Sequence, residues 1–262
     1  MTTFTNRNFG IEIECIAPPN ASNGGRELLA NALNARGVRS QSESYNHTTR
    51  SHWKITTDAS LPHNGLEVVS PILSGQAGLD TLKIVLETLN GMGYTVNRSC
   101  GIHVHQDAPE FDAGAMRRIC QMYLKYENLI DKLMAPSRRG QSSRWCKGHG
   151  QRFASFEQGM SQLKNADTMN RIRSAFTGGD RYHKLNLESY TRYGTVEFRQ
   201  HGGSLDFKKI SAWIYLTQGM MNEAARATYV NNHGRENMNA LLANTPCKET
   251  RKFLRQRVRA LA

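Results

Sequence analysis

The sequence predicts a single domain of the α+β class. Segments in which apolar and polar residues alternate, as on strands, are mixed along the chain with segments whose apolar residues recur every three or four positions, as on helices. Residues 185–190 and 195–200 read as a pair of strands, and antiparallel pairs are expected. No internal repeat, low-complexity tract or linker divides the 262 residues. We therefore expect one domain over 1–262, with 230–262 as a basic helical extension.

Most predicted strands are short runs in which β-branched or aromatic residues recur, bounded by polar residues, glycine or proline, whereas the run 38–45 is polar and alternating. The first is typical, because Ile11, Ile13 and Cys15 alternate with Glu12 and Glu14. The alternation places the two glutamates on one face and the apolar residues on the other. The predicted strands cover 9–16, 38–45, 53–57, 66–69, 102–106, 185–190 and 195–200.

Each predicted helix has an apolar stripe along one side. The clearest case is 112–134, in which Met116, Ile119, Tyr123 and Tyr126 are three or four positions apart. A buried core stripe explains these residues, and no cofactor role is needed. The predicted helices cover 26–36, 79–89, 112–134, 158–176, 206–229, 236–243 and 248–261.

Composition excludes some classes of protein and favours others. No apolar run approaches the roughly 18 residues of a membrane span, and residues 1–7 contain no apolar segment of the signal-peptide kind, so a cytoplasmic protein without membrane contact is expected. The five cysteines are far apart, which argues against a disulfide framework or a thiolate zinc site. The net charge of +12 favours nucleotides, nucleic acid or another polyanion as partners. The basic segment 138–152 is interpreted either as a flexible loop that closes over phosphates or as a solvated linker.

Four glutamates fall on predicted strands: Glu12, Glu14, Glu67 and Glu197. A buried carboxylate destabilises a core unless its charge is balanced. A solvated edge strand would explain Glu12 and Glu14 alone, but acids that recur on separate strands favour a shared cation. Oxygen ligands of this kind suit Mg²⁺, with Mn²⁺ as the alternative.

Two histidines, His103 and His105, fall on one face of the predicted strand 102–106. Their His-x-His-x-Asp pattern also occurs in zinc hydrolases, which makes a zinc-dependent hydrolase a third hypothesis. The acids on other strands favour Mg²⁺ instead. Arg199, two residues after Glu197, adds a guanidinium suited to a phosphoryl oxygen. Together these residue types indicate phosphoryl transfer.

Several motifs, taken in order, are shared with one known family. They are Gly10-Ile-Glu-Ile-Glu14, Asp58-Ala-Ser60, Glu67-Val-Val-Ser-Pro71, Cys100-Gly-Ile-His-Val-His105, Arg144-Trp-Cys-Lys147, Arg181-Tyr-His-Lys-Leu-Asn-Leu187 and Thr195-Val-Glu-Phe-Arg-Gln-His201. Over residues 9–216 the chain resembles the amidoligases, ATP-dependent carboxylate–amine ligases of the glutamine synthetase and glutamate–cysteine ligase superfamily. The resemblance implies a curved, mainly antiparallel sheet of the glutamine-synthetase-like type, with helices packed on its outer face and ATP and Mg²⁺ on its concave face.

The resemblance also implies roles for individual residues. Glu14 and Glu67 would bind one metal ion; Glu12, His103 and Glu197 would bind the other; His105 and Arg199 would contact ATP phosphates, with Arg199 also catalytic; Asp58 would position or deprotonate the amine; and Arg144, Arg181 and Asn186 would contact phosphate or substrate. The implied reaction activates a small-molecule or peptide carboxylate as an acyl phosphate, which an amine then attacks.

A competing hypothesis keeps the fold without catalysis. A nucleic-acid- or polyanion-binding protein would explain the +12 charge, the basic segment and the basic last helix. The retained glutamates oppose it, because carboxylates in a binding groove repel phosphate unless a metal is present.

Overall fold

The computed structural model describes residues 7–21, 25–141 and 143–262, which fall into two compact units. The sheet unit comprises the described residues up to His105 together with His201–Ser211. The helical unit comprises Gln106–Gln200 and Ala212–Ala262. Residues 1–6, for which the sequence predicts no signal segment, lie outside the described residues, as do residues 22–24 in a predicted turn and residue 142 in the basic segment.

Within the described residues, seven strands form one mixed sheet in the order β2-β3-β4-β1-β5-β7-β6. Their bounds are β1 Phe9–Ile16, β2 Ser40–Ser42, β3 Trp53–Thr56, β4 Gly65–Val69, β5 Gly101–Asp107, β6 Leu185–Asn186 and β7 Thr195–Gly202. β4 pairs antiparallel with β1 and β3, and β6 with β7, but β2 runs parallel to β3. The predicted mainly antiparallel sheet is thus corrected to a mixed one, with a parallel pair at its β2 edge. Residues 43–52 connect β2 to β3, and this connection is slightly shorter than the dozen or so residues usual between parallel strands.

The connection between β2 and β3 is held by the carboxylate of Glu43. It accepts hydrogen bonds from Arg50 Nη2 at 2.8 Å and Asn46 Nδ2 at 2.9 Å, and lies 2.7 Å from His52 Nε2. Lys54 Nζ, on β3, donates to the carbonyl of Asn46 at 2.7 Å. These contacts fix the crossover that makes β2 and β3 parallel.

Acid should weaken the fold through Glu43. The hydrogen bond from Arg50, with smaller help from His52 and Asn46, overcomes desolvation and lowers the pKa of Glu43 from 4.5 to about 2. Because the folded pKa lies below the unfolded one, this stabilisation is complete above about pH 4.5 and is lost as the pH falls through 2. We expect the free energy of unfolding, measured by urea titration from pH 5.5 to 2.5, to fall less steeply in Glu43→Gln than in the wild type. Glu87→Gln, which removes an exposed surface pair with Arg36, is the control. Parallel pH curves for Glu43→Gln and wild type would refute this account.

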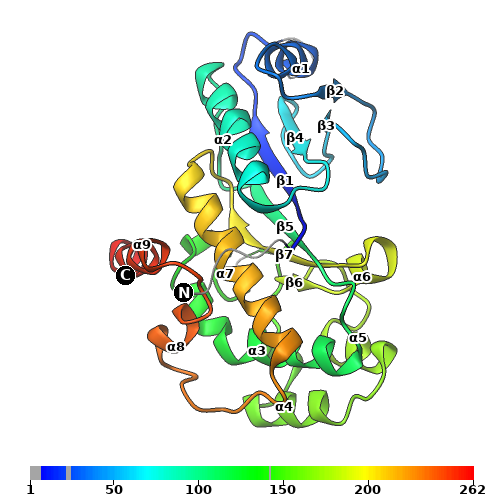
Figure 1. Cartoon of the computed structure of the whole chain (residues 1–262), viewed down its shortest axis with the longest axis vertical. Helices are drawn as coiled ribbons and strands as arrows, with labels where there is room; N and C mark the ends of the chain where they lie inside the picture. The colour runs from blue at the N-terminus through cyan, green and yellow to red at the C-terminus, as the bar shows by residue number, and fades with distance from the viewer. Residues whose placement is uncertain (1–6, 22–24, 142) are drawn as a thin grey trace. The chain divides into compact units, whose positions relative to one another are not determined.

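The sheet unit buries one face of its strands against two helices, α1 (Arg26–Ala35) and α2 (Gly75–Gly91). Ile11 and Ile13 of β1 are fully buried, whereas Glu12 between them is partly exposed. α1 lies against α2 and against β2 and β3 (Figure 1). The alternation along β1 is thus the predicted one, with apolar residues in the core and glutamates on the opposite face.

The helical unit is centred on α3, which packs against α4, α5 and α8 (Figure 1). The side chain of Asp112 caps α3 by accepting the amide of Ala115 at 2.7 Å. The helices are α3 Ala113–Asp131, α4 Phe156–Lys164, α5 Met169–Phe176, α6 Glu188–Tyr193, α7 Phe207–Arg226 (whose first turn belongs to the sheet unit), α8 Met238–Leu242 and α9 Lys248–Leu261, with short 3₁₀ helices η2 Pro136–Arg138 and η3 Gly150–Arg152. Along the described part of the chain, no helix is long and apolar enough to cross a membrane.

Two predicted elements differ from the structure because polar side chains cap helices there. The single helix predicted over 158–176 is two helices, α4 and α5, and the hydroxyl of Thr168 caps the second by accepting the amide of Arg171. The strand predicted over 185–190 ends after Asn186, whose Oδ1 accepts the amide of Glu188 at 2.8 Å and starts α6.

The basic segment 138–152 is attached to α3 rather than free. The carboxylate of Glu127 accepts the amides of His149 and Gly150, both at 2.8 Å. Asp131, one turn further along α3, accepts the amide of Gly140 at 2.8 Å. These contacts give the segment a fixed course over α3.

Candidate functional site

Three adjacent strands of the sheet unit bring acidic and imidazole side chains together. Glu14 on β1 and Glu67 on β4 are direct partners across the antiparallel pair, and His103 lies on β5, on the other side of β1. All three are buried, and each offers one ligand atom within 4.8 Å of the others. With Glu12 and His105 they form what we term the acid–imidazole cluster. The sequence predicts all five of these residues as site residues.

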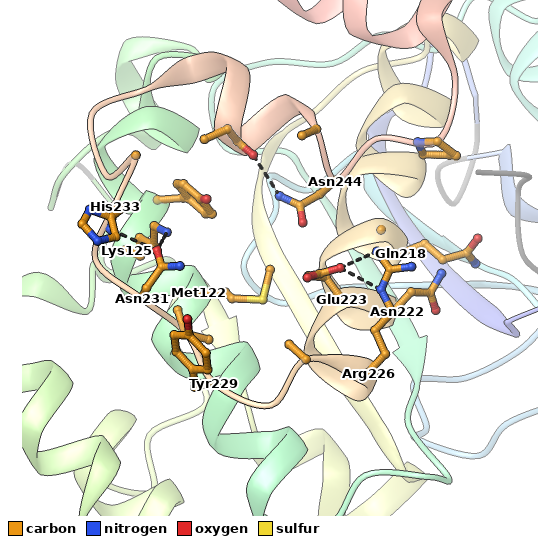
Figure 2. Close-up of a pocket in the computed structure, with 18 residues that line it drawn as sticks. Met122, Lys125, Gln218, Asn222, Glu223, Arg226, Tyr229, Asn231, His233 and Asn244 are labelled. Carbon is orange, nitrogen blue, oxygen red and sulfur yellow. Dashed lines mark hydrogen bonds and ion pairs between the residues drawn. The ribbon is translucent and has the colours of Figure 1, made fainter. Parts of the chain in front are cut away.

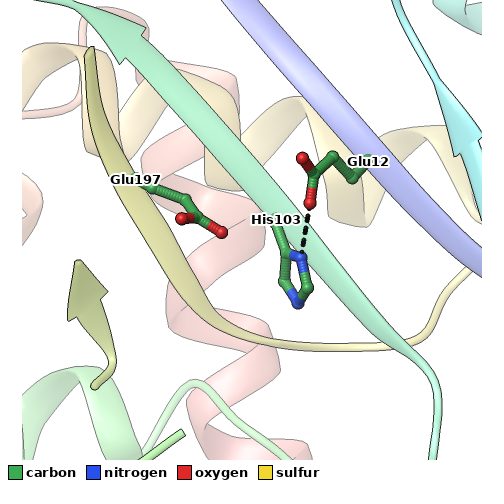
Figure 3. A group of neighbouring side chains, drawn as sticks. All are labelled: Glu12, His103 and Glu197. Carbon is green, nitrogen blue, oxygen red and sulfur yellow. Dashed lines mark hydrogen bonds and ion pairs between the residues drawn. The ribbon is translucent and has the colours of Figure 1, made fainter. Parts of the chain in front are cut away.

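Glu12 sets the orientation of both histidines. Its Oε2 lies 2.8 Å from His103 Nδ1 (Figure 3), and its Oε1 lies 3.4 Å from His105 Nε2. Because an ionised carboxylate only accepts, Nδ1 of His103 is the donor in this contact. The other ring nitrogen, Nε2, lies 3.6 Å from Glu14 Oε1, so His103 is in contact with two carboxylates. A histidine held by a carboxylate in this way is typical of metal ligands.

The two outer glutamates of the cluster have opposite pKa shifts. Burial raises the pKa of Glu12, but hydrogen bonds and charge from His103 and His105 outweigh it and leave the pKa well below its usual value. Burial, together with repulsion from Glu12, Asp58 and Glu14, raises the pKa of Glu67 well above its usual value. Lys54 offsets only part of this repulsion. A bound cation would offset the burial and the repulsion that raise the pKa of Glu67.

A divalent cation fits the side chains that surround Glu67. Thr56 is the β3 partner of Glu67, and its hydroxyl is buried without a hydrogen-bond partner among the residues that the structure describes. Glu14 and Glu67 supply carboxylate oxygens, and His103 supplies one nitrogen. A set made mostly of oxygen atoms suits Mg²⁺ or Mn²⁺ better than zinc, which prefers nitrogen and sulfur.

Asp58 follows β3 in a turn and is partly exposed. Its Oδ1 accepts the amide of Ser60 at 2.6 Å, and its charge contributes to the raised pKa of Glu67. Asp58 thus lies near enough to influence the cluster electrostatically, and its predicted role toward an amine stays a prediction.

The remaining predicted residues lie in the helical unit, where an aromatic pair collects three arginines. Trp145 and Tyr182 meet edge to face with their ring centroids 5.0 Å apart. Arg144 lies over Trp145 at 4.5 Å, and Arg181 and Arg199 lie over Tyr182 at 5.4 and 6.0 Å. Arg144 and Arg181 are exposed, whereas Arg199 is buried. We term these five residues the arginine–aromatic group; exposed guanidinium groups of this kind suit phosphate or carboxylate ligands.

Glu197 and Arg199 are neighbours on one face of β7 and pair with each other at 2.5 Å. Asn186 of β6, the strand partner of Glu197, donates its Nδ2 to the second carboxylate oxygen at 2.5 Å. The structure thus brings Asn186, Glu197 and Arg199 together. The predicted roles of Glu197 as a metal ligand and of Arg199 as a phosphate ligand stay predictions.

Sequence reasoning did not single out four residues of these two sites. Lys54 and Thr56 lie two apart on β3, and a polar alternation over 53–57 is the signal that would have found them. Trp145 and Tyr182 lie inside quoted motifs, next to the arginines that they support, but nothing in the sequence indicates that the two rings meet.

Comparison with known proteins agrees with the motifs. The family described as "Putative amidoligase enzyme" matches residues 5–221. Among curated proteins, none matches the chain. Among solved structures, a bifunctional glutathione synthetase from Pasteurella multocida has a TM-score of 0.48 and 12% identity, over 98% of this chain and 47% of that one. A novel glutamine synthase homolog also has a TM-score of 0.48 and 12% identity, over 97% of this chain and 67% of that one. The chain thus spans about half of the glutathione synthetase that it matches.

Proposed function

The chain belongs to the amidoligase family, and from this premise we propose that it joins a carboxylate to an amine with ATP and Mg²⁺. The observation that carries the proposal is the acid–imidazole cluster, in which Glu14, Glu67 and His103 present ligand atoms within 4.8 Å of one another. The substrates are taken to be small molecules or peptides.

In this proposal Glu14 and Glu67 hold one ion, with Nε2 of His103 near enough to be a further ligand, and Glu12 orients His103. A bound Mg²⁺ supplies positive charge that neutralises phosphate oxygens as a phosphoryl group is transferred. The motifs assign Glu12, His103 and Glu197 to a second ion. The oxygen-rich ligand set supports Mg²⁺, or Mn²⁺, over zinc.

The proposed reaction has two steps. A substrate carboxylate oxygen attacks the γ-phosphorus of ATP, the bond to the bridging oxygen breaks, and ADP leaves. The amine then attacks the acyl carbon, phosphate leaves with the bonding electrons, and the amine proton passes to a base, for which Asp58 is the candidate. His105 and Arg199 are assigned to phosphate oxygens, and Arg144, Arg181 and Asn186 to phosphate or substrate.

Calorimetric titration with ATP tests the proposal. We expect the wild type to bind ATP in the presence of Mg²⁺ and to bind it about 10- to 100-fold more weakly in EDTA, the loss typical when metal ligation is disturbed. Glu12→Gln and Glu197→Gln should each weaken binding in Mg²⁺, whereas Glu27→Gln, on the exposed side of α1, should not. Equal binding by the wild type and both site variants would refute the metal assignment.

A further inference from the structure

The helical unit contains a pocket with a volume of about 630 Å³, separate from the residues described above (Figure 2). α3 and the second half of α7 form two of its walls, and the segment 227–234 and residues 240–246, around the end of α8, form the others. No residue of the acid–imidazole cluster or of the arginine–aromatic group lines it. The volume lies within the roughly 300–1,000 Å³ that small-molecule sites occupy.

The wall on α3 presents a buried ammonium group. Lys125 is 7% exposed. Its Nζ lies 3.4 Å from Asn231 Oδ1 and 5.0 Å from the ring centre of Tyr126. Among the described residues, no carboxylate lies within ion-pair distance of this Nζ. Lys184, the other deeply buried lysine of this unit, has two carboxylates beside it. Burial lowers the pKa of Lys125, as expected for an ammonium group withdrawn from water without an anion beside it.

The other charges on the pocket wall do not supply the missing anion. Glu223 is held by Arg226, whose Nε and Nη2 lie 2.8 and 2.5 Å from its Oε2 (Figure 2). That pair is neutral as a whole, so Lys125 leaves the lining with a net positive charge. A negatively charged ligand would balance the charge of Lys125.

Two amide side chains of the lining have capacity left for a ligand. Asn231 uses its Oδ1 for Lys125 and for the amide of His233, and its Nδ2 has no partner among the described residues. Asn244 donates its Nδ2 to the carbonyls of Leu241 and Ala240, and its Oδ1 likewise has no partner within the described chain. One free donor and one free acceptor match the two hydrogen-bonding atoms of a peptide group.

The rest of the lining offers apolar surface. The side chain of Met122 is buried in the wall, and the ring of Tyr229, which is 71% exposed, stands at the edge of the pocket (Figure 2). An aromatic ring left in water at the edge of a pocket is suited to cover an apolar part of a ligand.

We propose that this pocket binds an amphipathic carboxylate, such as the C-terminal apolar residue of a short peptide. The carboxylate lies on Lys125, the neighbouring amide lies between Asn231 and Asn244, and the apolar side chain packs against Met122 and Tyr229. The inference uses none of the residues of the proposed ligase site, so the failure of either proposal leaves the other standing.

A matched pair of probes tests the role of the carboxylate. N-acetylphenylalanine and N-acetylphenylalaninamide differ only in that group, and calorimetry on the full chain measures both. We expect saturable binding of the acid and at least about tenfold weaker binding of the amide, the size of one charge-assisted hydrogen bond. A short peptide that ends in phenylalanine should bind more tightly than the acetylated residue if the natural ligand is a peptide, and no more tightly if it is a free carboxylate.

Variants distinguish this pocket from binding elsewhere. Lys125→Met keeps the length of the side chain and removes its charge, and it should weaken binding of the acid at least about tenfold. Lys164→Met, on the exposed end of α4, should leave binding unchanged. Tyr229→Ala, at a position where the side chain is 71% exposed, should also weaken binding of the acid. No binding of the acid to the wild type, equal binding of acid and amide, or unchanged binding by both pocket variants would overturn the proposal.

Discussion

Glu67→Gln is expected to abolish the stabilisation that Mg²⁺ gives the wild-type protein. Glu67 faces Glu14 across β1 and β4, and burial with the neighbouring acids raises its pKa well above the usual value. Mg²⁺ would relieve this repulsion in the wild type. At a concentration 100 times its dissociation constant, a ligand adds about 2.7 kcal/mol to the free energy of unfolding, or about 5 to 10 °C in melting temperature for a chain of this size. Thermal melts in EDTA and in Mg²⁺ measure the difference.

The controls for this prediction separate loss of the metal from loss of the fold. In EDTA at pH 8, Glu67→Gln should be at least as stable as the wild type, because it removes a buried carboxyl group that is costly to ionise. Glu27→Gln, exposed on α1, should keep the full response to Mg²⁺. A response to Mg²⁺ of equal size in Glu67→Gln and wild type would show that the cluster holds no ion.

Lys184→Met is expected to destabilise the protein by about 3–5 kcal/mol. Lys184 is fully buried, and its Nζ lies 2.6 Å from Asp131 and 3.2 Å from Glu127. Removing the ammonium leaves two carboxylates on α3 close together without their cation. Since the same carboxylates hold the amides of the basic segment, that segment should also become more sensitive to limited proteolysis. Urea unfolding measures the loss of stability.

A partly exposed ion pair is the comparison for Lys184. Lys147 lies 2.8 Å from Asp180, with 43% and 31% of the two side chains exposed. Solvent screens this pair, so Lys147→Met should cost at most about 1 kcal/mol. Similar costs for Lys147→Met and Lys184→Met would contradict the view that the buried pair stabilises the helical unit.

The sequence was most informative where one periodicity dominates. Alternation along β1 predicted that Glu12 and Glu14 lie on one face of the strand and the core residues Ile11 and Ile13 on the other. The structure confirms this arrangement. The stripe of α3 and the bounds of α9 were also predicted closely. In a sheet, side chains at neighbouring positions of adjacent strands point to the same face, so the acids on β1 and β4 meet the histidines on β5. The pattern along each single strand was therefore enough to predict these residues as one site.

Features that depend on individual side-chain contacts, and not on a periodic pattern, could not be predicted. The parallel pairing of β2 and β3 rests on the contacts of Glu43 with the chain that follows it, and the end of β6 rests on the hydrogen bond from Glu188 to Asn186. The meeting of Trp145 with Tyr182, 37 residues later in the chain, has no local signal. The basic segment was predicted as mobile or solvated because charge alone does not reveal the amides bound by Glu127.

The measurement that tests the central claim most directly is ADP release in the presence of Mg²⁺ and ATP, with a panel of amino acids, polyamines and peptides as substrates and the products identified by mass spectrometry. The account predicts that one carboxylate–amine pair stimulates ADP release and yields ADP, phosphate and amide in equal amounts. It also predicts that one oxygen of an ¹⁸O-labelled carboxylate appears in the phosphate, as an acyl phosphate requires, and that Glu67→Gln forms little product. ADP release that no amine stimulates, or amide formation whose phosphate carries no label, would contradict it.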